Sequence, residues 1–229
     1  MKILGFQKMT MLDFPGKIAC TIFTAGCNFR CPFCHNAPLV THIDGQEFSQ
    51  EEILSYLNKR KGMLDGVCIT GGEPLLQKDI KDLIIKIKEL GYAVKLDTNG
   101  SFPDVLKSLV SQNLIDYVAM DVKNSPSKYA LTADASESVV EKVDESIKFL
   151  LSGAIPYEFR TTVVKEFHTP TDFEEIGKWI EGADAYYLQA FVDSGDLIGT
   201  SLNALPKMEM EQCMNFVRPF VKKVEIRGI

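Results

Sequence analysis

Three cysteines lie within eight residues of one another in the segment GCNFRCPFCHN, which runs from Gly26 to Asn36. Cys27, Cys31 and Cys34 have the spacing C-x3-C-x2-C. A [4Fe–4S] cluster normally takes four cysteine thiolates, so three would leave one iron open. Catalytic metal centres keep such an open position for a substrate, whereas structural sites are closed. The spacing therefore favours an open [4Fe–4S] cluster.

Zinc is the alternative metal for this loop. Structural zinc normally takes four protein ligands, so a zinc site would have to recruit His35 or Cys20. His35 adjoins Cys34 in the chain, which makes tetrahedral ligation by both side chains awkward. Cys20, Cys68 and Cys213 lie inside apolar segments, and we interpret them as small core residues.

The elements that must position this loop alternate between strand and helix about six times. Apolar, β-branched runs predict strands at 18–23, 66–70, 93–97, 117–121, 157–164, 185–191 and 223–227. Helical spacing of apolar residues predicts helices at 49–62, 80–90, 102–112, 138–151, after residue 171 and at 207–217. This pattern indicates parallel strands covered by helices. Six units are too few for a complete eight-stranded barrel, so a partial, open barrel or a doubly wound sheet fits better.

Polar and glycine-rich segments follow four consecutive predicted strands. The cysteine loop follows the first, GGEP (71–74) the second, DTNG (97–100) the third and DVK (121–123) the fourth. In parallel α/β folds the chemistry lies at the carboxyl ends of the strands. We therefore expect these segments to line one rim.

Composition limits the classes of function. The chain has 229 residues and a net charge of −6, with no stripe of Lys or Arg, which argues against a nucleic-acid partner. No apolar run approaches the roughly 18 residues of a membrane span, so we expect no membrane association. The first residues lack the pattern of a signal peptide, and a cytoplasmic location is the expectation.

The loop CNFRCPFC resembles the cluster signature of the radical S-adenosylmethionine (SAM) enzymes, and GGEP resembles their second motif. Within that superfamily, the run from Gly5 to Asn36 together with DTNG, MDVK and RTTVV is similar to the glycyl-radical-enzyme activases. The closest likeness is to the anaerobic ribonucleoside-triphosphate reductase activating type, related to pyruvate formate-lyase activating enzyme. The fold we predict is therefore α/β, a partial (βα)6 TIM-like open barrel with parallel strands. We expect a single domain over 1–229, with the cluster loop at 24–40 and a C-terminal helix and strand at 207–227.

The resemblance implies that Cys27, Cys31 and Cys34 ligate three irons and that the amine and carboxylate of SAM chelate the fourth. It also implies three groups of contacts with SAM. Phe33 lies against the adenine, the GGEP backbone receives the methionyl ammonium, and the acids and lysine at later strand ends contact the amine, ribose or carboxylate. The implied cofactor-binding residues are Phe33, His35, Asn36, Gly71, Gly72, Glu73, Asp97, Asn99, Asp121 and Lys123.

Two positions depart from the related activases. Val192 stands where pyruvate formate-lyase activases carry a histidine, and Lys165 stands where the pattern often has proline. We therefore expect no adenosine contact from Val192 and assign no role to His168.

The resemblance implies an enzyme that reductively cleaves SAM to a 5′-deoxyadenosyl radical and makes a glycyl radical on a partner, most simply anaerobic ribonucleoside-triphosphate reductase. A flavodoxin or ferredoxin would supply the electron. Two alternatives stay open: a radical SAM enzyme acting on a small molecule, such as a 7-carboxy-7-deazaguanine synthase, and a non-enzymatic zinc-binding module.

Overall fold

The computed structural model describes residues 1–229, with eight strands whose order along the sheet follows the chain from β1 to β8. Because β1 and β8 are the edge strands, the sheet is open. The α/β class and the open sheet of parallel strands are thus confirmed. The chain divides into two compact units, unit 1 (1–28, 36–98 and 104–118) and unit 2 (29–35, 99–103 and 119–229). The assignment of one domain stays a prediction.

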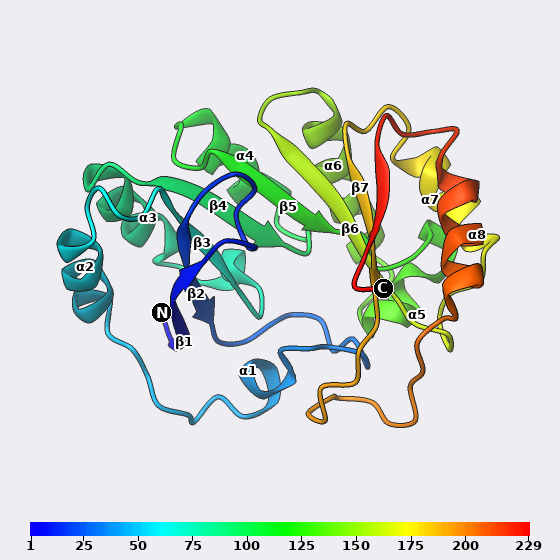
Figure 1. The fold of residues 1–229 in the computed structure, drawn as a ribbon, viewed down its shortest axis with the longest axis horizontal. Helices are drawn as coiled ribbons and strands as arrows, with labels where there is room; N and C mark the ends of the chain where they lie inside the picture. The colour runs from blue at the N-terminus through cyan, green and yellow to red at the C-terminus, as the bar shows by residue number, and fades with distance from the viewer. The chain divides into compact units, whose positions relative to one another are not determined.

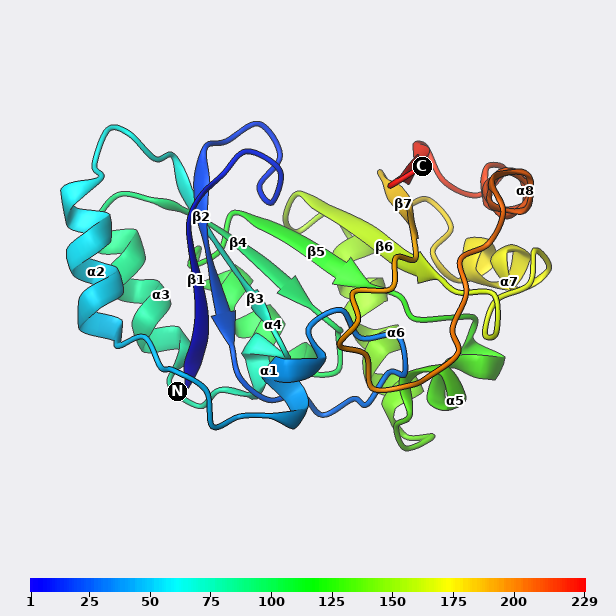
Figure 2. The same cartoon turned by 60° about the horizontal axis from the view of Figure 1, so that its bottom comes forward.

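The sheet of unit 1 contains one antiparallel pair and two parallel pairs. β1 (Ile3–Thr10) runs antiparallel to β2 (Ala19–Thr24), as Figure 2 shows for the hairpin. β2 pairs in parallel with β3 (Gly66–Gly71), and β3 pairs in parallel with β4 (Ala93–Thr98). The strand β1 is absent from the sequence prediction. Four of its eight residues are polar or glycine, and most are at least partly exposed, so it lacks the continuous apolar run of a buried strand.

Helices α2 and α3 lie side by side next to the strands of unit 1 (Figure 1). In α2 (Gln50–Lys59), a capping box closes the first turn, with Ser49 Oγ accepting from the Glu52 amide at 3.1 Å and Glu52 Oε2 accepting from the Ser49 amide at 2.8 Å. The remaining helical segments of this part of the chain are α1 (Ala37–Thr41), η1 (Pro74–Leu76), α3 (Ile80–Glu89) and α4 (Pro103–Ser111).

The loop between β1 and β2 fills the end of unit 1 where the parallel strands begin. Phe14 is only 3% exposed, and its ring lies so close to Gly66 that a Cβ at that position would be 2.9 Å away. Asp13 accepts a short hydrogen bond from Thr21, in the middle of β2. The aromatic ring of Phe14 and the charged side chain of Asp13 thus close this end of the sheet, whereas Leu12 is exposed.

Unit 2 repeats the parallel pattern. β6 (Tyr157–Val163) pairs in parallel with β7 (Tyr186–Ala190), which pairs in parallel with β8 (Val224–Arg227). Residues 119–121 of β5 (Tyr117–Asp121) also belong to this unit. Its helical segments are η2 (Pro126–Lys128), α5 (Tyr129–Ala133), α6 (Val139–Leu151), α7 (Asp172–Trp179) and α8 (Lys207–Val217). None of the helices in the protein combines the length and apolar character that crossing a bilayer requires.

The last strand is held by a charged contact as well as by the sheet. Arg227 donates to both carboxylate oxygens of Glu158 at 3.0 Å, and Glu158 is only 2% exposed. The Arg227 guanidinium also lies 3.3 Å from the ring centroid of Tyr187. A bidentate pair of this kind adds geometric specificity, which fixes the register of the short β8.

Replacing Phe14 by alanine is expected to lower the free energy of unfolding by about 3 kcal/mol or more, because a buried aromatic side chain leaves a cavity. Leu12→Ala, two residues away in an exposed position, should change it by less than about 0.5 kcal/mol. Urea denaturation of both variants measures this difference. Equal effects would mean that the loop does not close the end of the sheet as described.

Candidate functional site

None of the three cysteines of the loop is in a disulfide; Cys31 is buried, and Cys27 and Cys34 are partly exposed. Cys27 belongs to unit 1, and Cys31 and Cys34 belong to unit 2. Because Cys31 is only four positions after Cys27, their Cα atoms are at most roughly 14 Å apart, and this spacing permits the three thiols to bind one cluster. No three His, Cys, Asp or Glu side chains are arranged around a single metal ion. A cluster does not require that arrangement, since each thiolate binds a different iron. The donor set thus fits a [4Fe–4S] cluster.

The cysteines outside the loop are core residues, as predicted. Cys20, Cys68 and Cys213 are all 0% exposed. Burial raises the pKa of Cys20 and of Cys213 to about 12, so both remain protonated thiols at neutral pH. Only a thiolate binds a metal ion, which separates these residues from the loop.

The segment GGEP at the end of β3 is pressed against the chain that leads into Cys27. The Gly72 amide donates to Thr24 O at 2.9 Å, and the Glu73 amide donates to Gly26 O at 2.8 Å. A Cβ at Gly72 would lie 1.9 Å from Gly26 O, and Gly71 has φ +120°. Only glycine fits both positions, so this pair sets the path of the backbone from β2 into the cysteine loop.

Two further predicted residues support this backbone from their side chains. The buried Glu73 carboxylate accepts from the Leu75 amide at 3.0 Å and from Thr98 Oγ1 at 2.9 Å, which links the ends of β3 and β4. Asn36 donates from Nδ2 to Gly71 O at 2.9 Å. The structure therefore gives these side chains a supporting role at the strand ends. Their contacts with SAM stay predictions.

Asp97 lies near the end of β4 and Asn99 directly follows the strand, but the two belong to different units. Asp97 forms an ion pair with Lys95, which sequence reasoning missed. Asn99 is buried, and its Oδ1 accepts from the Ser101 amide at 3.0 Å and from Ser101 Oγ at 2.6 Å. Asn99 thus shapes the turn after the strand.

In unit 2, one carboxylate lies between two cations. Asp121 accepts from Lys123 Nζ at 2.9 Å and from Arg160 Nε at 3.0 Å. Burial by itself would raise the pKa of Asp121, but the charges of Arg160 and Lys123 outweigh it and hold this pKa well below its usual range. Burial would likewise lower the pKa of Lys123, yet Asp121 and the nearby Cys31 raise it. Lys123 is therefore a permanent cation next to a predicted cluster ligand.

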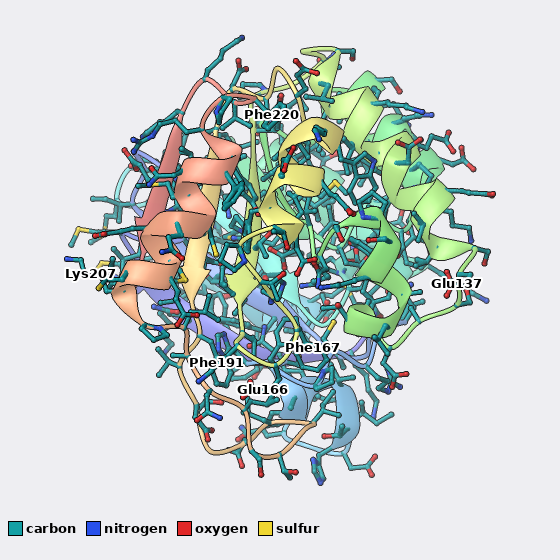
Figure 3. The ribbon with its side chains drawn as sticks, turned by 90° about the vertical axis from the view of Figure 1, so that its right-hand side faces the viewer. Glu137, Glu166, Phe167, Phe191, Lys207 and Phe220 are labelled. Atoms are coloured by element: carbon teal, nitrogen blue, oxygen red, sulfur yellow. The ribbon has the colours of Figure 1, made fainter.

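The aromatic residues of the loop pack against Phe167 and Phe191 of unit 2, both of which are labelled in Figure 3. His35 stacks on Phe191, with the ring centroids 5.8 Å apart and the planes at 13°. Burial lowers the pKa of His35, so the ring is neutral at pH 7. Phe33 is 4% exposed and lies 5.6 Å from the Phe167 ring. This places a flat, neutral ring pair beside Cys34, of the kind that can stack against a base.

His168, to which the sequence assigned no role, is a buried structural residue. With the proton on Nε2, it donates to Lys123 O at 2.8 Å, while Nδ1 accepts from the Val164 amide at 3.1 Å. It thereby fixes the backbone of Lys123. Val192 is 61% exposed, and the lack of an assigned adenosine contact there stays a prediction.

Sequence reasoning missed Lys95, Arg160 and Phe191. A signal existed for the two cations, since each interrupts an otherwise apolar strand, in AVKLD and YEFRTTVV. Lys95 also lies two residues before Asp97, which places both on one face of β4.

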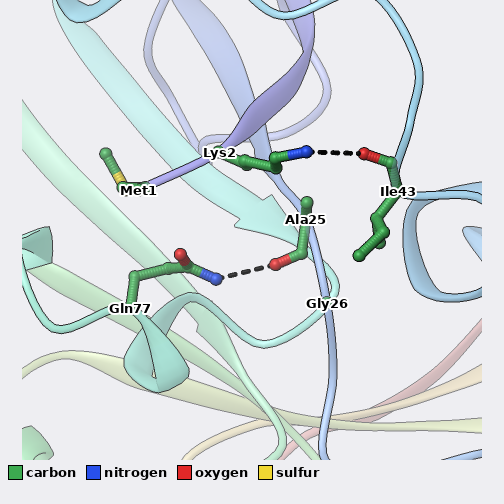
Figure 4. A pocket seen from close by; sticks show the side chains of 6 residues that line it. All are labelled: Met1, Lys2, Ala25, Gly26, Ile43 and Gln77. Carbon is green, nitrogen blue, oxygen red and sulfur yellow. Dashed lines mark hydrogen bonds between the residues drawn. The ribbon is translucent and has the colours of Figure 1, made fainter.

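A cavity of about 360 Å³ adjoins the cysteine loop on unit 1. Its lining residues are Met1, Lys2, Ala25, Gly26, Ile43 and Gln77 (Figure 4). Lys2 donates to Ile43 O at 3.2 Å, and Gln77 donates to Ala25 O at 2.7 Å. The second bond holds the residue two positions before Cys27, and none of the predicted SAM-binding residues lines this cavity.

Comparison with known proteins gives a consistent family. The sequence profile of the Radical SAM superfamily matches residues 21–180. A Methanocaldococcus jannaschii protein named "Putative glycyl-radical enzyme activating enzyme" is 32% identical over 99% of this chain and 96% of its own length. The pyruvate formate-lyase-activating enzyme of Clostridium pasteurianum is 33% identical over 54% of this chain and 52% of its own length.

Solved structures support the fold. Streptococcus suis SuiB bound to S-adenosylmethionine superposes with a TM-score of 0.70 at 14% identity, over 90% of this chain and 49% of that chain. A domain of pyruvate-formate lyase-activating enzyme from Bacteroides vulgatus gives a TM-score of 0.58 at 16% identity, over 71% of this chain and 99% of that chain.

Gly72→Ala is expected to destabilise the protein by about 2 kcal/mol and to lower the iron bound per chain, because the added methyl group displaces the backbone at Gly26. Gly45→Ala is the matched control, since a Cβ there would meet only a Leu4 methyl group at 3.9 Å. Thermal unfolding and iron analysis after anaerobic reconstitution test both variants. Normal iron content in a folded Gly72→Ala protein would show that the close approach of Gly72 to Gly26 does not position the cysteine loop.

Burial lowers the pKa of His168, so the folded state stays unprotonated there while the unfolded chain binds a proton below about pH 6.5. Stability from this residue is present above that pH and is lost as the pH falls. His168→Gln should therefore reduce the dependence of unfolding free energy on pH between 7 and 5, by up to about 1.4 kcal/mol per pH unit. Replacing the exposed His42 in the same way should leave the slope unchanged, and an unchanged slope for His168→Gln would refute the buried neutral state.

Proposed function

The chain belongs to the radical S-adenosylmethionine superfamily, and from that premise we propose that it is a glycyl-radical-enzyme activase. Its cofactors are a [4Fe–4S] cluster and SAM. The observation that carries the proposal is the relative named as an activating enzyme, which aligns with 99% of this chain and 96% of its own length. Similarity over almost the whole of both chains includes the regions outside the shared cofactor motifs.

When bound, the reduced cluster and SAM supply a 5′-deoxyadenosyl radical, and the chain's residues hold and orient these groups. Cys27, Cys31 and Cys34 would ligate three irons, which leaves the fourth for the amine and carboxylate of SAM. The GGEP backbone and Asp97 would accept hydrogen bonds from the methionyl amine. Lys123, kept cationic by Asp121, would bind the carboxylate, for which a lysine is suited.

The neutral pair of His35 and Phe191 offers a flat surface for the adenine next to the cluster loop, and Phe33 of the same loop is buried. Asn36 and Asn99 hold the backbone at the strand ends from which these contacts are made. A site assembled from buried aromatic and charge-paired groups also limits water near a reactive radical.

The partner we propose is anaerobic ribonucleoside-triphosphate reductase, on whose backbone glycine the radical would be generated. A flavodoxin or ferredoxin would supply the electron. This assignment rests on the likeness of the cysteine loop, DTNG and MDVK to that activase type. An oxygen-sensitive cluster also suits the reducing cytoplasm, where we place the protein. No nucleic acid or membrane partner forms part of this proposal.

A small-molecule radical SAM reaction is the second candidate. The 7-carboxy-7-deazaguanine synthase of Methanospirillum hungatei is 31% identical over 77% of this chain and 71% of its own length. The cofactor motifs are common to both readings, so these similarities do not separate them. The zinc-binding module is set aside, because the superfamily match covers the cysteine loop and 160 residues in all, 21–180.

The first test is cleavage of SAM by the reconstituted, chemically reduced protein under anaerobic conditions, with 5′-deoxyadenosine quantified by chromatography. We expect product that is lost in Cys31→Ala, because one cluster ligand is missing. Cys213→Ala, which changes a buried cysteine outside the loop, should retain it. Product from Cys31→Ala equal to that of the wild type would contradict the ligand assignment.

The second test separates the two candidate reactions. With anaerobic ribonucleoside-triphosphate reductase present, electron paramagnetic resonance should detect a glycyl radical on the reductase, formed in proportion to 5′-deoxyadenosine. A reductase with that glycine replaced by alanine serves as the control. Production of 7-carboxy-7-deazaguanine, with no radical on any glycyl radical enzyme, would instead favour the small-molecule reaction.

A further inference from the structure

A charged side chain lies buried in the middle of β4. Lys95 is only 2% exposed, and its neighbours in the strand, Val94 and Leu96, are fully buried apolar residues. Removing an ammonium group from water costs several kcal/mol unless a counter-charge and hydrogen bonds compensate. The sequence therefore places a costly group where valine or isoleucine would suit the strand.

The counter-charge of Lys95 is Asp97. Lys95 Nζ donates to Asp97 Oδ1, and both side chains project from the same face of β4 because they are two residues apart. Cys68, which is directly opposite Lys95 in the register of β3 and β4, lies against the same pair. Its Sγ is 3.8 Å from Asp97 Oδ1 and 3.9 Å from Lys95 Nζ.

This arrangement constrains the carboxylate of Asp97. Lys95 and Cys68 both contact Oδ1, from the layer of the sheet that lies one step below Asp97 in the strand direction. Asp97 Oδ1 therefore faces the interior of the sheet, and these contacts fix the orientation of the carboxylate. Asp97 is next to the last residue of β4, so the group held in this way lies at the carboxyl end of the strand.

A purely stabilising role explains the pair poorly. Replacing a buried ion pair by apolar residues of similar volume is often neutral or stabilising, whereas removing one partner is strongly destabilising. A buried lysine at this position is therefore better explained by what it does to Asp97. An oriented carboxylate at a strand end is suited to accept a hydrogen bond from an amine.

We propose that Lys95 is a positioning residue that orients the Asp97 carboxylate to accept a hydrogen bond from the methionyl amine of SAM. Lys95 itself does not touch SAM; it acts through Asp97. This inference rests on the proposed function, in which Asp97 binds that amine. It goes further by assigning the affinity for SAM to a pair of residues rather than to one.

The experiment is a double-mutant cycle on SAM binding by cluster-loaded, unreduced protein, so that no turnover occurs. Equilibrium dialysis with labelled SAM gives the dissociation constants of the wild type, Lys95→Met, Asp97→Asn and the double variant. Each single variant is expected to weaken binding at least about tenfold. The double variant should bind no more weakly than Asp97→Asn, because Lys95 has no effect once Asp97 has lost its charge. Lys86→Met, which makes the same substitution at an exposed lysine of α3, is the control and should stay within about twofold of the wild type.

Stability separates positioning from a structural role. Lys95→Met removes the cation next to the half-buried Asp97 and should lower the melting temperature, whereas the double variant removes both charges and should regain much of it. Affinity for SAM should not recover with stability. If Lys95→Met does not fold, comparing Asp97→Asn with the double variant still decides the question.

Several outcomes would overturn the inference. Unchanged affinity in a folded Lys95→Met protein, or a double variant that binds several-fold more weakly than Asp97→Asn, would show that Lys95 does not act through Asp97. Unchanged affinity in Asp97→Asn would remove the contact on which the inference depends. Absence of SAM binding by the cluster-loaded wild type would instead contradict the proposed function itself.

Discussion

The close approach of two backbone segments at the ends of β2 and β3 is the constraint on which the candidate site depends. Gly72 lies so near Gly26 that no side chain fits between them, and amide to carbonyl bonds join the two segments. The chain therefore leaves β2 along a single path before it reaches Cys27. A cluster ligand on a loop acquires a defined position only when a rigid element holds that loop, and here the next strand does so.

Two acidic residues at strand ends each have a cation beside them. Asp97 is paired with Lys95 of the same strand, and Asp121 with Arg160 of β6 and with Lys123. Without its partners, burial of Asp121 would favour the neutral acid. The cations that sequence reasoning passed over thus belong to the same electrostatic arrangement as the predicted site residues.

The similarities to known proteins place the cofactor chemistry more firmly than the substrate. The relative named as an activating enzyme and a 7-carboxy-7-deazaguanine synthase are each identical to this chain at about one aligned residue in three. They share the superfamily to which it belongs, while a partner is recognised by surfaces outside those motifs. The choice of a glycyl radical enzyme therefore rests on alignment over the full length of the chain rather than on the cluster loop.

The sequence by itself determined the α/β class, seven of the eight strands, the six longest helices, the three thiols and the polar segments at the strand ends. These follow from local information: apolar periodicity, glycine pairs and cysteine spacing. The strand β1 was not expected, because a half-exposed edge strand lacks a continuous apolar run. Only the tertiary structure decided which groups meet. The stacking of His35 on Phe191, the anchoring of Lys123 by His168 and the pairing of Asp121 with Arg160 join residues 39 to 156 positions apart, and no local pattern encodes such contacts. Lys95 is the intermediate case. Its spacing of two residues from Asp97 is visible in the sequence, but its burial, from which we infer its role, is a property of the fold.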